Sequence, residues 1–405
     1  MRILVIGIFL ATSLFGFFLQ YLMYRRMNSP LPDNVKDVYD EEGYKKNQKY
    51  LMANTKFSIT FGLVGVMITM VVLLSNFHSH LFDYISNHTV NIYITGIFII
   101  AVPIFLESII DHFFNIYHTF VLEERFGFNK TTVKTYILDT IKETLIAIII
   151  GGGLLSLFIF LYSTLGDTVF LIFFFLLIGL SLFIMFIYPL LIRIFYKLTP
   201  LEEGELKSRV EELVAKTGYN IKGIYMVDAS RRSTKMNAFA SGFGKTKTIG
   251  LFDTLVEKMT TDEIIAILAH EVGHAKKHHI IKQMPLTLLT VGVMCLAAFF
   301  IVTQPAVSQA FGFADTNIVF GVFIMAILIS PLLMVLNIPD NVISRKHEYE
   351  ADAYAKELTG DDSMISALKK LYREDLGNLT PHPFVVKIEY SHPTLSQRVV
   401  ALAEE

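Results

Sequence analysis

The hydrophobic residues of this chain are gathered into long blocks that alternate with charged segments. Seven blocks approach the ~20 residues that a helix needs to cross a bilayer, and they run roughly over 3–23, 57–77, 93–113, 143–163, 169–195, 284–304 and 317–337. One such block can be a buried core helix, but seven together predict an α-helical protein that crosses a membrane several times. No small-residue cleavage site follows the first block, so we interpret it as a span and not as a signal peptide.

The other two stretches, 196–283 and 338–405, are rich in polar and charged residues. The first stretch begins with a short helical segment, and short extended runs follow, in which β-branched and aromatic residues predict strands. These runs are Gly223 to Asp228 and Thr248 to Asp253, with Asn237 to Gly244 between them. We therefore expect membrane helices 1–5 over 1–195, an α+β domain over 196–283, membrane helices 6 and 7 over 284–337, and the C-terminal part of the domain over 338–405.

Lys and Arg are concentrated in every second connection between the predicted spans. They follow the first and third spans and are frequent in 196–283 and in the C-terminal tail, whereas the connections 78–92, 164–168 and 305–316 contain none. Because positively charged loops stay on the cytoplasmic side, this alternation places the N-terminus outside and the 196–283 segment in the cytoplasm.

Composition agrees with a membrane protein and narrows the chemistry. The chain of 405 residues is 53% hydrophobic and only 18% charged, against about 25% charged residues in globular proteins. Its net charge of −2 gives no indication of a nucleic-acid partner. The single cysteine, Cys295, excludes an intramolecular disulfide and a cysteine-rich metal site.

An H-E-x-x-H pattern gives the strongest indication of chemistry. His270 and His274 are four residues apart, so on a helix they share one face and can bind one metal ion, while Glu271 can act on a water molecule beside it. Thr260 and Glu263 fit a capping box, which predicts the start of that helix. Two surface histidines on an amphipathic helix are the alternative.

A catalytic zinc ion usually has three protein ligands and one open position, so a third ligand is expected elsewhere. The charged segment 344–355 is the best candidate. Glu348 and Asp352 are four residues apart there, so Glu348 could bind the metal while Asp352 accepts a hydrogen bond from a ligand imidazole. On spacing alone His347 and Glu350 are rival ligands, and a solvated charged helix is an equal alternative.

Several segments together resemble the type I CAAX prenyl protease family of integral-membrane zinc proteases. The resemblance covers most of the chain from about residue 120 and rests on the segments 123–130, 200–204, 237–239, 251–255, the H-E-x-x-H pattern, 345–355 and 392–393. It implies a ring of seven helices around a water-filled chamber within the membrane. It also implies one Zn²⁺ bound by His270, His274 and Glu348, with Glu271 as the general base.

The resemblance implies roles for further residues as well. Asn237 matches an asparagine on a strand beside the substrate, and Asp352 matches the aspartate behind the zinc ligands. His392 and Arg398 match a histidine and an arginine that stabilise the reacting carbonyl, although His392 by itself resembles a surface histidine before a proline. His279 matches a recurrent position to which we assign no role.

Some features depart from the family pattern. Small residues follow Asn237 where bulky aromatic ones are common, the connecting loops are short, and a C-terminal dilysine retrieval signal is absent. The small residues imply a substrate groove of different shape. The short loops and the absent signal favour a bacterial member in the inner membrane, with the active site on the cytoplasmic side; a eukaryotic member would be expected in the endoplasmic reticulum membrane.

We therefore expect a zinc metalloendopeptidase that is surrounded by membrane lipids, requires no oligomer, and hydrolyses membrane-associated or prenylated peptides. Two alternatives stay open. One is a general quality-control metalloprotease for membrane proteins. The other is a transporter or channel with a structural zinc site, against which Glu271 argues, because a structural zinc is usually closed by four protein ligands.

Overall fold

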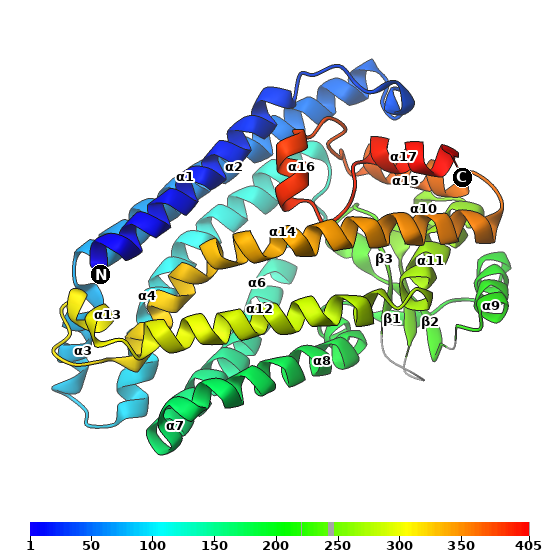
Figure 1. The fold of residues 1–405 in the computed structure, drawn as a ribbon. Coiled ribbons are helices and arrows are strands. Elements are labelled where there is room, and N and C mark those ends of the chain that lie inside the picture. The colour runs from blue at the N-terminus through cyan, green and yellow to red at the C-terminus, as the bar shows by residue number, and fades with distance from the viewer. Residues whose placement is uncertain (220, 242–246, 405) are drawn as a thin grey trace.

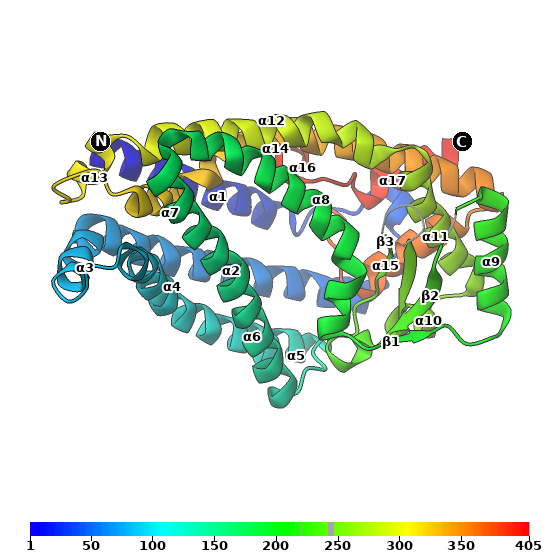
Figure 2. The same cartoon turned by 90° about the horizontal axis from the view of Figure 1, so that it is seen from below.

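The computed structural model describes residues 1–219, 221–241 and 247–404. Long helices make up most of the molecule, and a small sheet with its own helices lies at one end (Figure 1). Turned by 90°, the same long helices extend from the opposite end toward this sheet (Figure 2). The N-terminus lies far from the sheet, whereas the C-terminus lies close to it (Figure 1).

Six helical segments of the described chain are long and apolar enough to cross a membrane. They are Arg2–Arg26, Glu41–Leu74, Ile92–Phe126, Val133–Phe195, His279–Val302 and Ile318–Thr359. The fourth segment turns at Gly166, whose φ is +57°, and therefore contains two of the predicted spans. Every predicted span lies largely on one of these helices, so the prediction of a multi-spanning α-helical membrane protein is confirmed.

Short helical turns divide or follow the long helices. The bounds of this part are α1 (Arg2–Arg26), η1 (Asp33–Val35), α2 (Glu41–Leu74), α3 (Phe77–Ser86), α4 (Ile92–Tyr117), the π-helical η2 (His118–Glu123), α5 (Glu124–Phe126), α6 (Val133–Ala147), the π-helical η3 (Ile148–Gly152), α7 (Gly153–Leu165), η4 (Gly166–Thr168), α8 (Val169–Phe195), α12 (His279–Val302), α13 (Pro305–Ala310) and α14 (Ile318–Thr359). A triple-glycine segment overlaps η3, and no neighbouring side chain lies within contact distance of where a Cβ would be at Gly151, Gly152 or Gly153. The glycines therefore mark a local change in helix type and not a close helix contact.

Two predicted domain boundaries lie inside continuous helices. The boundary at 283/284 lies within α12, and the boundary at 337/338 lies within α14, which runs unbroken for 42 residues. Hydropathy detects only the apolar part of a helix, so it does not show that α12 and α14 continue as polar turns into the domain. As a consequence, the segment 344–355 is carried on the same rigid helix as the seventh span.

The sheet has four strands in the order β1-β2-β4-β3. The strands are β1 (Leu198–Pro200), β2 (Gly223–Val227), β3 (Ala238–Ser241) and β4 (Thr248–Phe252). β2 and β4 are parallel, and the other two pairings are antiparallel. The predicted strand pattern is confirmed within a residue for β2 and β4, while part of the segment Asn237 to Gly244 between them lies outside the described residues. β3 pairs with one strand only in the described chain, so it forms an edge of the sheet.

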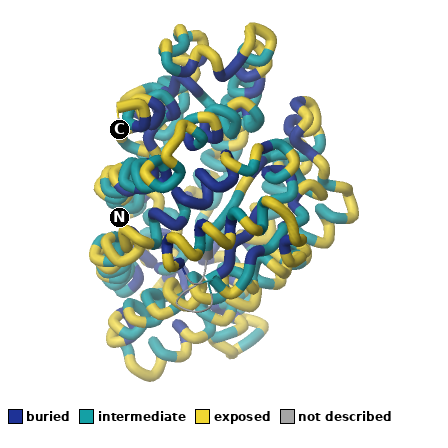
Figure 3. The backbone as a smooth tube through the Cα atoms, turned by 90° about the vertical axis from the view of Figure 1, so that its right-hand side faces the viewer, coloured by how far each residue is buried: buried dark blue, intermediate teal, exposed yellow. Residues whose placement is uncertain are grey.

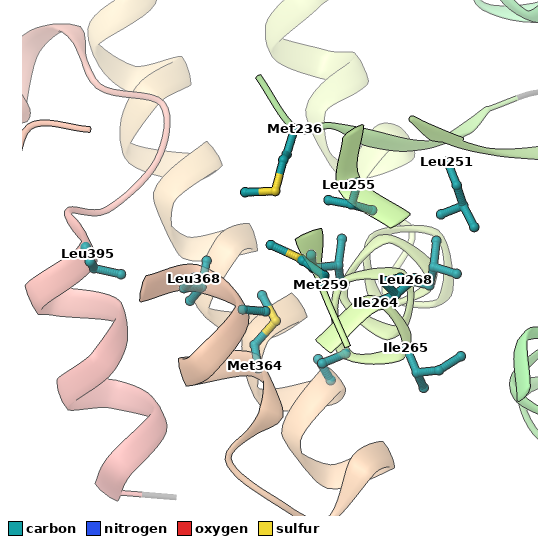
Figure 4. Close-up of a cluster of buried hydrophobic side chains, with 14 of the residues drawn as sticks. Met236, Leu251, Leu255, Met259, Ile264, Ile265, Leu268, Met364, Leu368 and Leu395 are labelled. Atoms are coloured by element: carbon teal, nitrogen blue, oxygen red, sulfur yellow. The ribbon is translucent and has the colours of Figure 1, made fainter. Parts of the chain in front are cut away.

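Helices cover the sheet and form the core of the domain. They are α9 (Glu205–Thr217), η5 (Ala229–Arg231), α10 (Asp253–Lys258), α11 (Thr261–Lys276), α15 (Ser363–Glu374), α16 (Pro383–Glu389) and α17 (Leu395–Glu404). A cluster of buried apolar side chains joins β4, α10, α11, α15 and α17, and it includes Leu251, Leu255, Ile264, Leu268, Leu368 and Leu395 (Figure 4). Burial of each such side chain stabilises the fold by about 1.5–3 kcal/mol, which holds α11 firmly in place.

Burial differs strongly between the two parts of the molecule. Seen from the sheet end, buried segments lie near the centre of the domain, and exposed segments predominate on the outer helices (Figure 3). Large apolar side chains such as Phe113 and Phe175 are exposed on α4 and α8. Exposed apolar helices of this length are expected where lipid, and not water, is the solvent.

The orientation in the membrane gives a first testable prediction. Fusions of a topology reporter after Glu203 and after Asp315 are expected to report opposite sides, cytoplasmic for Glu203, because Lys and Arg are frequent around the first site and absent from the connection that carries the second. Reporter activity in intact cells measures this. Two reports from the same side would contradict the predicted topology.

Candidate metal centre and active site

α11 presents the two histidines of the H-E-x-x-H pattern to one point. Its start is fixed by the predicted capping box: the Thr260 hydroxyl accepts from the Glu263 amide at 3.3 Å, and the Glu263 carboxylate accepts from the Thr260 amide at 2.9 Å. His270 and His274 are one helical turn apart, and their Nε2 atoms lie 3.1 Å from each other. Both rings therefore direct a nitrogen into the same small space.

Glu348 on α14 completes this group. Its Oε1 lies 3.3 Å from His274 Nε2, and its Oε2 lies 3.6 Å from His270 Nε2. Atoms bound at about 2.0–2.1 Å to one tetrahedral ion are separated by roughly 3.3 Å, which is close to all three spacings. The donor set thus has the dimensions that a single divalent ion requires.

The polar atoms of this group also need a partner. Glu348 is 4% exposed, and its Oε2 is buried with no hydrogen-bond donor in the described chain. An unsatisfied buried carboxylate oxygen costs free energy, which a bound cation removes. The residues therefore fit a metal ion by spacing, by burial and by the chemistry of their donors.

A glycine allows α11 and α14 to approach closely enough for this geometry. A Cβ added at Gly273 would lie 3.3 Å from both the Cα and the carbonyl oxygen of Ala351. Gly273 lies between His270 and His274 in α11, opposite Ala351 on the turn of α14 that follows Glu348. Its missing side chain thus lets the third carboxylate reach the histidine pair.

Asp352 and Arg398 lie behind the histidines. Asp352 Oδ1 is 2.9 Å from His270 Nδ1, on the side of the ring opposite the shared point. Arg398 on α17 donates to both Asp352 oxygens, from Nε at 2.7 Å and from Nη2 at 2.5 Å. Its third nitrogen, Nη1, lies 3.6 Å from Glu348 Oε2. The guanidinium is therefore largely engaged by Asp352, and only one edge is directed at the candidate centre.

Glu271 lies beside the centre but does not belong to the group of converging donor atoms. In the described residues no side chain donates a hydrogen bond to its carboxylate, so both oxygens are free to act on a small molecule. Burial raises the pKa of Glu271 above its ordinary value, and the neighbouring His270 and His274 oppose that shift. A carboxylate with a raised pKa is a better proton acceptor, as a general base requires.

His392 approaches the centre from the segment between α16 and α17. Its Nε2 lies 3.4 Å from Glu348 Oε1, and its Nδ1 lies 2.8 Å from the Ser391 hydroxyl. The side chain is 61% exposed, so it borders the centre on its open side. The structure thus places His392 beside the centre. It lies about 120 residues after the H-E-x-x-H pattern, so sequence spacing alone could not predict this contact.

Asn237 precedes β3 at the edge of the sheet. Its carbonyl accepts from the Phe252 amide at 3.1 Å, and its side-chain oxygen accepts from the Ala238 amide at 2.8 Å. β3 itself contacts α11. This strand, which is an edge strand among the described residues, therefore lies beside the helix that carries the two histidines.

The rival ligands lie elsewhere. His347 stacks on His279, with ring centroids 4.1 Å apart, and Glu350 Oε2 lies 3.2 Å from His279 Nε2. Neither residue belongs to the group of converging donor atoms, which contains His270, His274 and Glu348. Sequence spacing could not make this distinction, because adjacent positions on α14 differ only in the direction in which the helix points them.

Comparisons with known proteins extend over the whole chain. Residues 20–197 match the family model described as "CAAX prenyl protease N-terminal, five membrane helices", and residues 200–405 match the model of peptidase family M48. CAAX prenyl protease 1 of Saccharomyces cerevisiae is 32% identical to this chain, over 99% of the chain and 95% of the yeast protein.

More distant relatives and a solved structure agree with these matches. The CAAX prenyl protease 1 homolog of Homo sapiens is 27% identical, over 92% of this chain and 88% of that protein. The crystal structure of S. mikatae Ste24p superposes with a TM-score of 0.93 at 30% identity, over 99% of this chain and 98% of that chain. These relatives are eukaryotic, and the bacterial origin inferred from the sequence departures stays a prediction.

Proposed function

The chain belongs to the CAAX prenyl protease family of membrane metalloendopeptidases, peptidase family M48, and from this premise we propose that its metal ion is Zn²⁺. His270, His274 and Glu348 would hold the ion, with Asp352 behind His270 as the partner that orients the ring. Two imidazoles and one carboxylate with an open side are a donor set typical of catalytic zinc. The observation that carries the proposal is the convergence of these three side chains beside the free carboxylate of Glu271.

The residues around the centre supply the proton transfers. When bound, the metal ion would supply the Lewis acidity that makes a water molecule nucleophilic near neutral pH. Glu271 accepts the proton of that water and passes it to the amine that leaves when the peptide bond breaks. Its lack of other hydrogen bonds leaves it free for both transfers.

The developing negative charge on the substrate carbonyl needs a donor on the open side. We assign this role to His392, whose Nε2 faces the centre while Nδ1 contacts Ser391. Arg398 contributes mainly through its charge, because Asp352 occupies two of its three nitrogens. Donors already directed at the position of the developing charge lower the barrier, since they need not reorganise during the reaction.

The substrate is held as an extended strand. β3 exposes one edge and lies against α11, so a peptide that pairs with that edge beside Asn237 would pass the centre by β-augmentation. The centre lies on α11 and α14. Because α14, and α12 directly after α11, continue into the membrane, substrates with an apolar or lipid-modified part are favoured. We propose cleavage of membrane-associated, CAAX-type peptides on the cytoplasmic side.

A paired cleavage assay tests this substrate class. The purified protein in lipid nanodiscs is expected to cleave an extended peptide with a C-terminal prenylated cysteine faster than its unprenylated twin, and to cleave both. The apolar chain adds membrane affinity without being required at the reacting bond. Rates for the two peptides at matched concentrations measure the difference.

Metal removal is the control in the same assay. A zinc chelator should stop cleavage of both peptides, and stoichiometric zinc should restore it. Strict dependence on the prenyl group would restrict the enzyme to CAAX processing. A protein with zinc bound that cleaves neither peptide would contradict the proposed substrate class and favour unfolded membrane proteins as the substrates.

A further inference from the structure

A break between α11 and α12 brings His279 onto His274. His278 adopts the left-handed conformation with φ +56°, a strained state for a residue that is not glycine. In a continuous helix, residues five apart point in different directions. The turn at His278 folds the chain back, so that His279 Nδ1 lies 2.9 Å from His274 Nδ1. His279 is 4% exposed and is the first residue of α12.

His279 also contacts a carboxylate on α14. Its Nε2 lies 3.2 Å from Glu350 Oε2, and the same oxygen lies 3.2 Å from Lys282 Nζ. On its face, His279 is stacked against His347 with an interplanar angle of 9°. The ring is thus fixed at both nitrogens and against one face, although the proposed reaction gives it no role.

Only one assignment of protons satisfies this series of contacts once His274 binds a metal through Nε2. A neutral His274 then carries its proton on Nδ1 and donates it to His279 Nδ1. His279 must accept there, so its own proton is on Nε2, from which it donates to Glu350 Oε2. Metal-bound histidines almost always donate their other N–H to such a partner, which fixes ring orientation and raises ligand basicity.

We propose that His279 and Glu350 are positioning residues that form a relay from the carboxylate through His279 to His274 and so fix His274 for metal binding. Asp352 supports His270 directly, and this relay supports the second histidine through an intervening imidazole. Because His279 begins α12 and Glu350 lies on α14, the relay also couples the metal ligand to two membrane helices that pack along each other. The inference rests on the metal site of the proposed function.

Zinc affinity, measured by competition with a chromophoric chelator, tests the relay independently of catalysis. His279→Leu removes the acceptor for His274 Nδ1–H and is expected to weaken zinc binding about 10–100-fold, the usual cost of losing such a partner. His279→Asn places an amide oxygen near the position of Nδ1 and should restore much of that affinity. Co²⁺ substitution adds a spectroscopic signature, because a tilted His274 changes the ligand field in the Leu variant.

Two further variants guard against a general loss of structure. Glu350→Gln keeps the shape and an acceptor oxygen but removes the charge, so we expect a smaller loss than with His279→Leu. Lys346→Ala alters an exposed neighbour of Glu350, 3.9 Å away, and should bind zinc as the wild type does. Thermal unfolding of the metal-free proteins checks that all variants fold.

The outcomes separate the relay from the proposed function. If the wild type binds no zinc, the metal site itself is wrong and the relay is overturned with it. If the wild type binds zinc and cleaves peptide while His279→Leu binds zinc equally well, only the relay is overturned. Equal weakening by His279→Leu and His279→Asn would also overturn it, since the Nδ1 acceptor would then be irrelevant.

Discussion

Replacing Glu271 with Gln is expected to abolish peptide cleavage while leaving zinc bound. The three donor atoms that converge on the candidate centre come from other residues, and Gln has nearly the same size and shape as Glu. The amide cannot accept a proton from water or return one to the leaving amine. General acid–base catalysis contributes typically about 10²–10⁴-fold, and because one residue serves both transfers here, we expect a loss near the upper end of that range.

The measurement joins metal analysis with a peptide-cleavage assay on the same preparation. Glu271→Gln should contain one zinc per chain and retain the chelator affinity of the wild type. Glu257→Gln, a glutamate on α10, serves as a matched control for the loss of one carboxylate in the same domain. Near-normal turnover by the Glu271 variant would exclude this residue as the base, and loss of zinc would show that it is a ligand or essential to the fold of the site.

The placement of Glu271, His270 and His274 on one helix follows from local sequence. Helical periodicity places positions i and i+4 on one face whatever the rest of the chain does, and the capping box at Thr260 marks the start of that helix. The membrane spans can also be predicted from local sequence, because a helix that crosses a bilayer needs about 20 apolar residues in a row. These features are local, so sequence patterns can predict them.

Other features depend on long-range packing that sequence patterns do not encode. The choice of Glu348 over Glu350 depends on the direction in which α14 faces α11, and the close contact at Gly273 sets that direction. Arg398 could be placed near the centre only through the family resemblance. The structure adds that Asp352 holds two of its nitrogens.

The position of His279 could not be predicted either. Neither glycine nor proline marks the turn at His278, although this residue adopts a left-handed conformation. Without that turn, a histidine five residues after His274 would belong to a different face of α11. The same applies to the edge position of β3, which follows from a strand order in which β4 lies between β2 and β3.

Glu348→Ala is expected to lose both zinc and activity, whereas His347→Ala, one position earlier on α14, should largely keep both. Glu348 supplies the only carboxylate of the three converging side chains, so its removal takes away one ligand and one negative charge. Zinc affinity should fall by more than the roughly 10–100-fold that the loss of an outer partner costs. Chelator competition and the peptide-cleavage assay measure the two effects in both variants.

The comparison with His347 separates ligand loss from damage to the helix. His347 is nearly as buried as Glu348 and lies on the same turn of α14. However, it stacks on His279 and is not among the three residues whose donor atoms converge on the centre. Its replacement removes packing against an outer partner, so a modest loss of affinity is expected. If instead Glu348→Ala kept zinc and His347→Ala lost it, the third ligand would be His347, and α14 would have to be rotated relative to α11 from its position in this structure.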